Sequence, residues 1–155
     1  MKGNEQIIQK LNDLLADELT AINQYMVHAE MCDDWGYAAL AEATEKRAIQ
    51  EMKHAETLIG RILFLEARPT VSNLHPMYIG TEVTSQLKND HKAEQDAIQA
   101  YNEAIQQVAA LGDNGTAEIL KAILQDEEAH IDWIETQLSQ IEQLGLQIYL
   151  AQQVR

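Results

Sequence analysis

Two short segments of the sequence each place a glutamate three residues before a histidine. Glu51 and His54 form the first pair, and Glu127 and His130 form the second, 76 residues further along. Side chains three residues apart lie on one face of a helix, where they can bind the same ion. A single such pair is a weak signal, because many exposed helices carry one, but a repeated pair indicates a metal site built from two similar halves.

Each pair also has a lone glutamate upstream, Glu18 for the first and Glu94 for the second, again 76 residues apart. The residues around them repeat as well: Ala21, Ile22 and Tyr25 return as Ala97, Ile98 and Tyr101. This repeat predicts two similar helical hairpins that follow one another in the chain. Folding its halves about a pseudo-twofold axis brings together six candidate metal-binding and catalytic side chains: Glu18, Glu51, His54, Glu94, Glu127 and His130.

The charge of this set predicts that it binds metal. Four carboxylates and two neutral imidazoles carry a charge of about −4, which is very costly to bury without partners, and two divalent cations neutralise it. Helical bundles that offer one Glu from each of two helices and Glu-x-x-His from each of the other two hold di-iron or di-manganese centres. The alternative is that these residues are solvated helix faces or ordinary ion pairs.

Composition favours a single all-α domain over residues 1–155. Hydrophobic residues make up 46% of the 155, and only 7 Gly and 2 Pro interrupt the chain. A formal net charge of −14 argues against nucleic-acid binding by simple repulsion. Cys32 is the lone cysteine, so no intrachain disulfide is expected, and a small buried apolar role is favoured over a reactive one.

The sequence gives no signal of membrane insertion or secretion. No run of about 18 apolar residues exists, so we expect no membrane-spanning segment. The start, Met1 to Glu5, leads into an amphipathic helix and does not resemble a signal peptide. A cytoplasmic location is the default expectation.

Hydrophobic periodicity predicts four long helices, at residues 4–34, 37–66, 81–111 and 116–144, with Thr116 as a candidate N-cap. Residues 68–80 hold both prolines and form one long connection. A single long crossover is typical of ferritin-like four-helix bundles. Residues 146–154 are predicted to form a short fifth helix or an assembly contact. The wide apolar face of the first helix indicates either a subunit contact or a broad core contact.

Several other side chains are weaker candidates. Tyr25 and Tyr101 lie seven residues after Glu18 and Glu94, so their hydroxyls are expected either to hydrogen-bond ligand carboxylates or to serve unrelated groups. Met52 lies on a helix flank, where packing against another subunit is the ordinary role. Packing or surface roles are also favoured for four further residues: His28, His75, His91 and Trp133.

Motifs along the whole chain resemble the bacterioferritin family. The matching segments are Met1-Lys2-Gly3, Asn23-Gln24-Tyr25, Trp35-Gly36, Glu51-Met52-Lys53-His54-Ala55, residues 61–66, Asp126-Glu127-Glu128 with His130, and Gly145-Leu146-Gln147. The resemblance implies a ferritin-like bundle with a short fifth helix. It also implies a ferroxidase centre at the six candidates, in which Glu51 and Glu127 bridge the irons.

The resemblance further implies an assembly and a second cofactor. It implies a hollow shell of 24 subunits built from twofold dimers. It also implies a haem b between two subunits, ligated by Met52 from each. The haem pocket then includes the flank residues Leu19, Ile22, Asn23, Met26 and Ile49. The shell consists of one subunit type or is mixed with a second, and an electron-donor protein is an implied partner.

The expected function is iron storage and detoxification. Fe(II) is oxidised by O2 or H2O2, and ferric mineral is stored. Two alternatives remain: a haem-binding shell subunit with little ferroxidase activity, and another ferritin-like di-iron oxidase. One departure concerns Lys46 and Gln50, which stand where some relatives carry His and Asp facing the cavity. This departure puts an inner-surface iron site in doubt.

Overall fold

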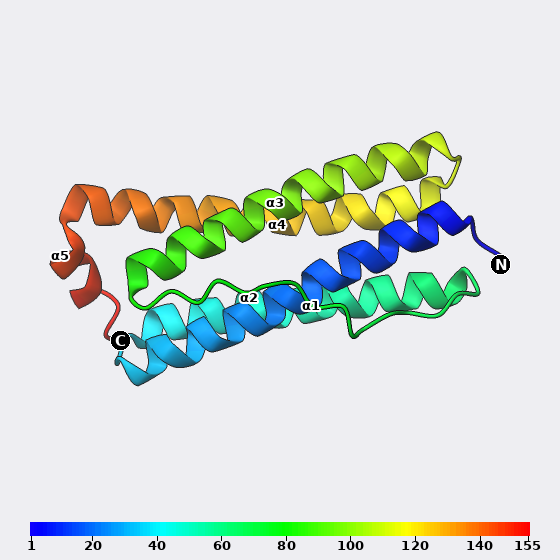
Figure 1. Cartoon of the computed structure of the whole chain (residues 1–155). Helices are drawn as coiled ribbons and strands as arrows, with labels where there is room; N and C mark the ends of the chain where they lie inside the picture. The colour runs from blue at the N-terminus through cyan, green and yellow to red at the C-terminus, as the bar shows by residue number, and fades with distance from the viewer.

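The computed structural model describes all 155 residues and contains five α-helices (Figure 1). Their bounds are α1 (Glu5–Asp34), α2 (Ala38–Phe64), α3 (Val83–Ala110), α4 (Asn114–Leu144) and α5 (Leu146–Ala151). α1 and α2 pair as one hairpin, and α3 and α4 pair as the other. The predicted all-α bundle with a short C-terminal fifth helix is confirmed. No helix is both long and apolar enough to cross a membrane.

The start of α4 differs from the prediction that Thr116 is its N-cap. Asp113 is the N-cap, and its side chain accepts a hydrogen bond from the backbone N–H of Thr116 at 3.0 Å. The Thr116 hydroxyl also donates to the other Asp113 oxygen at 2.5 Å. An N-cap acceptor binds the N–H of the second or third helical residue. Thr116 is therefore the third residue of the helix that Asp113 caps.

The segment between α2 and α3 is the single long crossover, and it runs the length of the first hairpin (Figure 1). It forms no helix or strand, so its backbone N–H groups need other partners. Side chains of α1 accept three of them: Asn12 from Thr70, Thr20 from His75 and Gln24 from Tyr78. These bonds fasten the crossover along α1, and the predicted ferritin-like connection is confirmed.

Apolar side chains form two clusters, one toward each end of the bundle. The larger has 14 buried residues and the smaller has seven. On α1 the candidate ligand Glu18 lies between Leu15 of the larger cluster and Cys32 of the smaller one. The ligands on α2, α3 and α4 lie between the two clusters in the same way. Each candidate ligand therefore occupies the middle of its helix, with apolar packing on both sides.

Most of the buried residues of α1 lie on the apolar face that the sequence predicts for the first helix. Ile7, Leu11 and Leu14 are buried, and Cys32 is 3% exposed, as expected for a packing residue. Burial, with a smaller contribution from the charge of Asp90, raises the pKa of the Cys32 thiol to about 11. The thiol is thus protonated at neutral pH and unreactive.

Candidate metal centre

The structure brings the six predicted ligands together in the middle of the bundle. Glu18 comes from α1, Glu51 and His54 from α2, Glu94 from α3, and Glu127 and His130 from α4; each is 6% exposed or less. They fall into two groups that share two carboxylates, and within each group the ligand atoms lie within 4.8 Å of one another. The groups are Glu18, Glu51, His54 and Glu127, and Glu51, Glu94, Glu127 and His130.

Both imidazoles present Nδ1 to the carboxylates. His54 Nδ1 lies 2.9 Å from Glu127, 3.3 Å from Glu51 and 3.6 Å from Glu18. His130 Nδ1 lies 3.0 Å from Glu51, 3.2 Å from Glu94 and 4.0 Å from Glu127. The two halves therefore repeat one geometry, as the 76-residue sequence repeat predicts, with Glu51 and Glu127 common to both.

Four carboxylate oxygens in the centre are buried without a hydrogen bond: one each from Glu18, Glu51, Glu94 and Glu127. Several lie close to an imidazole nitrogen but in a geometry that does not suit hydrogen bonding. A buried carboxylate oxygen without a partner is costly, and such cases call for a specific explanation. Oxygen and imidazole donors arranged in this way suit two adjacent divalent cations such as iron. The residues present therefore fit a di-iron site.

Without metal, protons balance the charge of the centre. Burial and the nearby charge of Glu51 raise the pKa of Glu18 well above its usual range. Burial and the nearby carboxylates of Glu94 and Glu51 do the same for the pKa of Glu127. Burial alone lowers the pKa of His130, but the carboxylates of Glu51 and Glu94, 3.0 and 3.2 Å from its Nδ1, outweigh burial and raise the pKa to about 9.

His54 and Glu51 shift in opposite directions. Burial opposes the charged form of His54, yet the nearby carboxylates of Glu127, Glu18 and Glu51 hold its pKa far above the usual range. Burial also opposes the charged form of Glu51, but its close contacts with the Glu18 carboxyl group and with both imidazoles hold its pKa well below the usual range. When no metal is bound, these shifts favour protonated imidazoles around an ionised Glu51.

Hydrogen bonds from two tyrosines connect the two hairpins at the candidate ligands. The Tyr25 hydroxyl on α1 donates to Glu94 on α3 at 2.7 Å, and the Tyr101 hydroxyl on α3 donates to Glu18 on α1 at 2.5 Å. Both hydroxyls are buried, and of the two roles left open by the sequence the structure shows hydrogen bonding to the candidate ligand carboxylates. Each hydroxyl holds one oxygen of a glutamate that belongs to only one of the two ligand groups, and leaves the other oxygen free to bind metal.

A buried network beside the Glu94 half was missed by sequence reasoning. Arg47 on α2 is 5% exposed, and its Nη2 donates to Asp90 on α3 at 2.8 Å. Its Nη1 lies 4.0 Å from Glu94 and has no hydrogen bond. The guanidinium stacks 4.4 Å from the Tyr25 ring. Burial alone raises the pKa of Asp90, but Arg47 and His28 outweigh it and hold the pKa below its usual range.

His28 links this network to the crossover. Its Nε2 accepts the backbone N–H of Gly80 at 3.0 Å, so Nδ1 must carry the proton that is donated to Asp90 at 2.8 Å. A Cβ at Gly80 would lie 2.3 Å from the backbone nitrogen of Gln86, which permits only glycine there. Arg47 and Asp90 each lie one helical turn before a predicted ligand, and that spacing was the available sequence signal.

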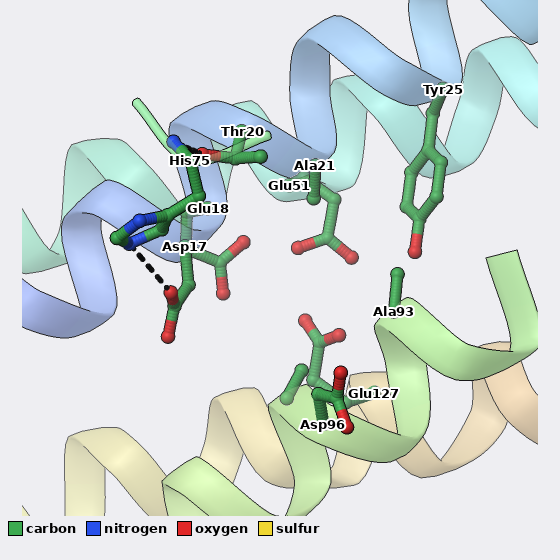
Figure 2. A pocket seen from close by; sticks show the side chains of 11 residues that line it. Asp17, Glu18, Thr20, Ala21, Tyr25, Glu51, His75, Ala93, Asp96 and Glu127 are labelled. Atoms are coloured by element: carbon green, nitrogen blue, oxygen red, sulfur yellow. Dashed lines mark hydrogen bonds and ion pairs between the residues drawn. The ribbon is translucent and has the colours of Figure 1, made fainter. Parts of the chain in front are cut away.

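A pocket of about 160 Å³ leads from the surface to this centre (Figure 2). Glu18, Glu51 and Glu127 line its inner part, and the carboxylates of Glu51 and Glu127 face one another from opposite hairpins (Figure 2). At its mouth, His75 Nε2 of the crossover lies 3.3 Å from Asp17. His75 therefore lies on the approach to the ligands, whereas His91 contacts Glu135 at 3.2 Å on the exposed side of the bundle.

A separate groove of about 260 Å³ lies between α1 and α2 around Met52, which is 44% exposed. Of the predicted haem-pocket residues, the groove brings Ile22, Met26 and Ile49 together with Met52. It does not include Leu19 or Asn23, and Leu19 instead packs against the larger apolar cluster. The groove is open to solvent in the single chain, as a site completed by a second subunit is.

Comparisons with known proteins agree with this architecture. Residues 8–144 match the family described as "Ferritin-like domain". The chain is 42% identical to the bacterioferritin of Rhodobacter capsulatus over 95% of its own length and 91% of the relative. It is 41% identical to the bacterioferritin of Brucella melitensis, over 96% and 92% of the two chains. Identity to the bacterioferritin of Streptomyces coelicolor is also 42%, over 97% and 90%.

Proposed function

Because this chain belongs to the bacterioferritin family and stores iron, we propose that its buried six-residue cluster is a di-iron ferroxidase centre that oxidises Fe(II) for storage. The observation that carries the proposal is the set of four buried carboxylate oxygens without hydrogen bonds, converging with two imidazole nitrogens. Such a set favours two divalent cations, which bring its charge of about −4 close to zero.

In this proposal the terminal ligands are Glu18 and Glu94, and the bridging ligands are Glu51 and Glu127, with His54 and His130 completing the two halves. Two adjacent irons can supply two electrons together to O2 or H2O2, which limits release of one-electron oxygen radicals. Tyr25 and Tyr101 hold the terminal carboxylates in place by their hydrogen bonds. The pocket between Asp17 and the ligands provides access for Fe(II).

Rapid mixing of the protein with Fe(II) in air tests this proposal. We expect ferric absorbance to rise much faster than in a protein-free control, and to saturate in a first phase at about two irons per chain, as a two-metal centre requires. A rate equal to the control, in protein of normal assembly, would instead support the alternative of a shell subunit with little ferroxidase activity.

We further propose that the chains assemble into a shell of 24 subunits in the cytoplasm, from one subunit type or mixed with a second. Apolar side chains are exposed on several elements, among them Met26 and Met52 beside the α1–α2 groove and Leu63 and Phe64 at the end of α2. Apolar surface of this extent indicates contacts with other subunits. Light scattering that finds only a small dimer would favour a different ferritin-like di-iron oxidase.

A haem b at the α1–α2 groove is the remaining part of the proposal, with an electron-donor protein as its partner. Met52 and Ile49 line one side of the groove and Ile22 and Met26 the other, so a twofold dimer would supply two thioether ligands. A haem bound there would supply a route for electrons that reduce stored Fe(III) for release.

Met52→His tests this haem site independently of the di-iron centre. We expect the haem absorption bands to shift or disappear, because imidazole replaces the soft sulfur ligand. Fe(II) oxidation should be unchanged, since Met52 is exposed and forms no part of the six-residue cluster. Met52→Leu, which keeps the apolar volume, should lose the same bands. Spectra identical to those of the unmodified protein would exclude Met52 as a ligand.

A further inference from the structure

The two histidines of the centre differ in the group that lies behind each ring. Nε2 of His54 is 2.8 Å from a carboxylate oxygen of Asp126, whereas Nε2 of His130 is hydrogen bonded to the amide oxygen of Gln50. A carboxylate that accepts the outer N–H of a metal-binding imidazole makes the inner nitrogen more basic, and losing such a partner commonly costs about 10- to 100-fold in metal affinity. An uncharged amide oxygen supports its histidine less strongly.

Arg47 adds a second difference in the same direction. Its Nη1 lies 4.0 Å from Glu94, the terminal carboxylate of the His130 half, and has no hydrogen bond. Asp90 balances part of this charge through Nη2, at 2.8 Å. Glu18, the corresponding carboxylate of the other half, has its only ion-pair contact with His54. A cation bound at the Glu94 half therefore meets a positive charge that the Glu18 half lacks.

We propose that the two halves of the centre bind metal with unequal affinity. The half formed by Glu18 and His54 fills first and holds its ion more tightly. The half formed by Glu94 and His130 fills second and releases its ion more readily. In this inference, which rests on the proposed di-iron function, Asp126, Gln50 and Arg47 act as positioning residues through the ligands they contact.

Crystals of metal-depleted, assembled protein soaked with one equivalent of Co(II) per chain test this inequality. Anomalous scattering measures the occupancy of each half separately and does not depend on oxidation activity. We expect occupancy at the Glu18 half to exceed that at the Glu94 half by about tenfold or more, in line with the effect of a carboxylate partner. Equal occupancy of the two halves would overturn the inference.

Gln50→Glu places a carboxylate of the same length behind His130 and should remove or reverse the preference. Asp126→Asn should lower the metal affinity of the Glu18 half. The substitution should not disturb folding, because the Asp126 side chain is 41% exposed. Lys46→Gln is the matched control: it makes the same change in net charge on α2, but its side chain is 73% exposed and pairs only with Glu42. It should leave the order of filling unchanged.

The outcomes separate this inference from the function on which it rests. If Co(II) fills neither half even in excess, the proposed di-iron centre itself is wrong. If both halves fill but Gln50→Glu keeps the original preference, the centre stands and the role of Gln50 and Asp126 is overturned. A shift of occupancy toward the Glu94 half in Gln50→Glu, with none in Lys46→Gln, supports the inference.

Discussion

Replacing Glu18 with glutamine is expected to abolish rapid Fe(II) oxidation while leaving the metal-free protein as stable as before, or more stable. The amide removes one terminal carboxylate but can still accept the hydrogen bond from Tyr101. We expect initial oxidation to slow by about 100-fold or more, because loss of even an outer partner of a metal ligand commonly costs 10- to 100-fold. Stopped-flow absorbance with Fe(II) in air measures this rate.

The stability of Glu18→Gln should change in the opposite sense. Burial raises the pKa of Glu18, so its ionised form is unfavourable in the metal-free centre and an amide relieves that cost. We expect the metal-free Tm to stay the same or to rise by about 2–4 °C, the shift that 1 kcal/mol produces in a chain of this size. The stabilisation of about 2.7 kcal/mol that one divalent ion gives at 100 times its Kd should be lost at the Glu18 half.

Glu56→Gln provides the control for this substitution, because Glu56 is exposed on α2 and is not part of the six-residue cluster. It should alter neither the oxidation rate nor the metal-dependent stabilisation. Should Glu18→Gln oxidise Fe(II) as fast as the unmodified chain, Glu18 is not a ligand. Should its metal-free form be strongly destabilised, the carboxylate serves the fold through Tyr101 and the proposed division of roles is wrong.

Helical spacing explains why the sequence was sufficient to predict where the six side chains would meet. A helix places residues three, four and seven apart on one face, so Glu51 and His54 necessarily share a direction, and the 76-residue repeat places their counterparts opposite. The same spacing predicted the hydrogen bonds of Tyr25 and Tyr101. It could not predict that these bonds cross from one hairpin to the other, because that depends on how the hairpins pack.

Hydrophobic periodicity in the sequence could not predict features that depend on side-chain rotamers or on the path of the crossover. Arg47 and Asp90 lie on inward-facing positions of different helices, and their pairing depends on side-chain directions that only the packed bundle defines. The bond between Gly80 and His28 requires the path of an 18-residue connection with no regular structure, residues 65–82. The prediction that Thr116 caps α4 was wrong because Asp113, three residues earlier, accepts the capping hydrogen bond.

Raising the pH should destabilise the metal-free protein and strengthen metal binding at the same time. The pKa of His130 is raised from 6.5 to about 9, and the pKa of His54 is raised further. A group whose folded pKa lies above its unfolded value contributes stability that is complete below the unfolded pKa and is lost as pH rises through the folded one. For His130 this window runs from about pH 6.5 to 9.

The apparent affinity for metal is expected to rise with pH, because the metal must displace these protons. Protonated imidazoles cannot bind a cation, so filling both halves releases about two protons from His54 and His130, and more from any protonated glutamate. The apparent affinity for a pair of ions should therefore rise by about 100-fold per pH unit below the pKa of His130. Thermal unfolding from pH 6 to 9, with and without Co(II), measures both trends, and a pH electrode in weakly buffered solution counts the released protons.

Glu18→Gln distinguishes these titrations from the general effect of pH on an acidic protein. The variant keeps both histidines and the Glu94 half but has lost one ligand of the Glu18 half, so the difference between the metal-dependent and metal-free curves should shrink at every pH to the part that the Glu94 half contributes. If the metal-free chain were equally stable at pH 6.5 and pH 9, the imidazoles could not be the proton carriers. If Co(II) bound without proton release, the cluster could not be held by shared protons before metal arrives, and ionised carboxylates would instead be compensated by the buried charge of Arg47.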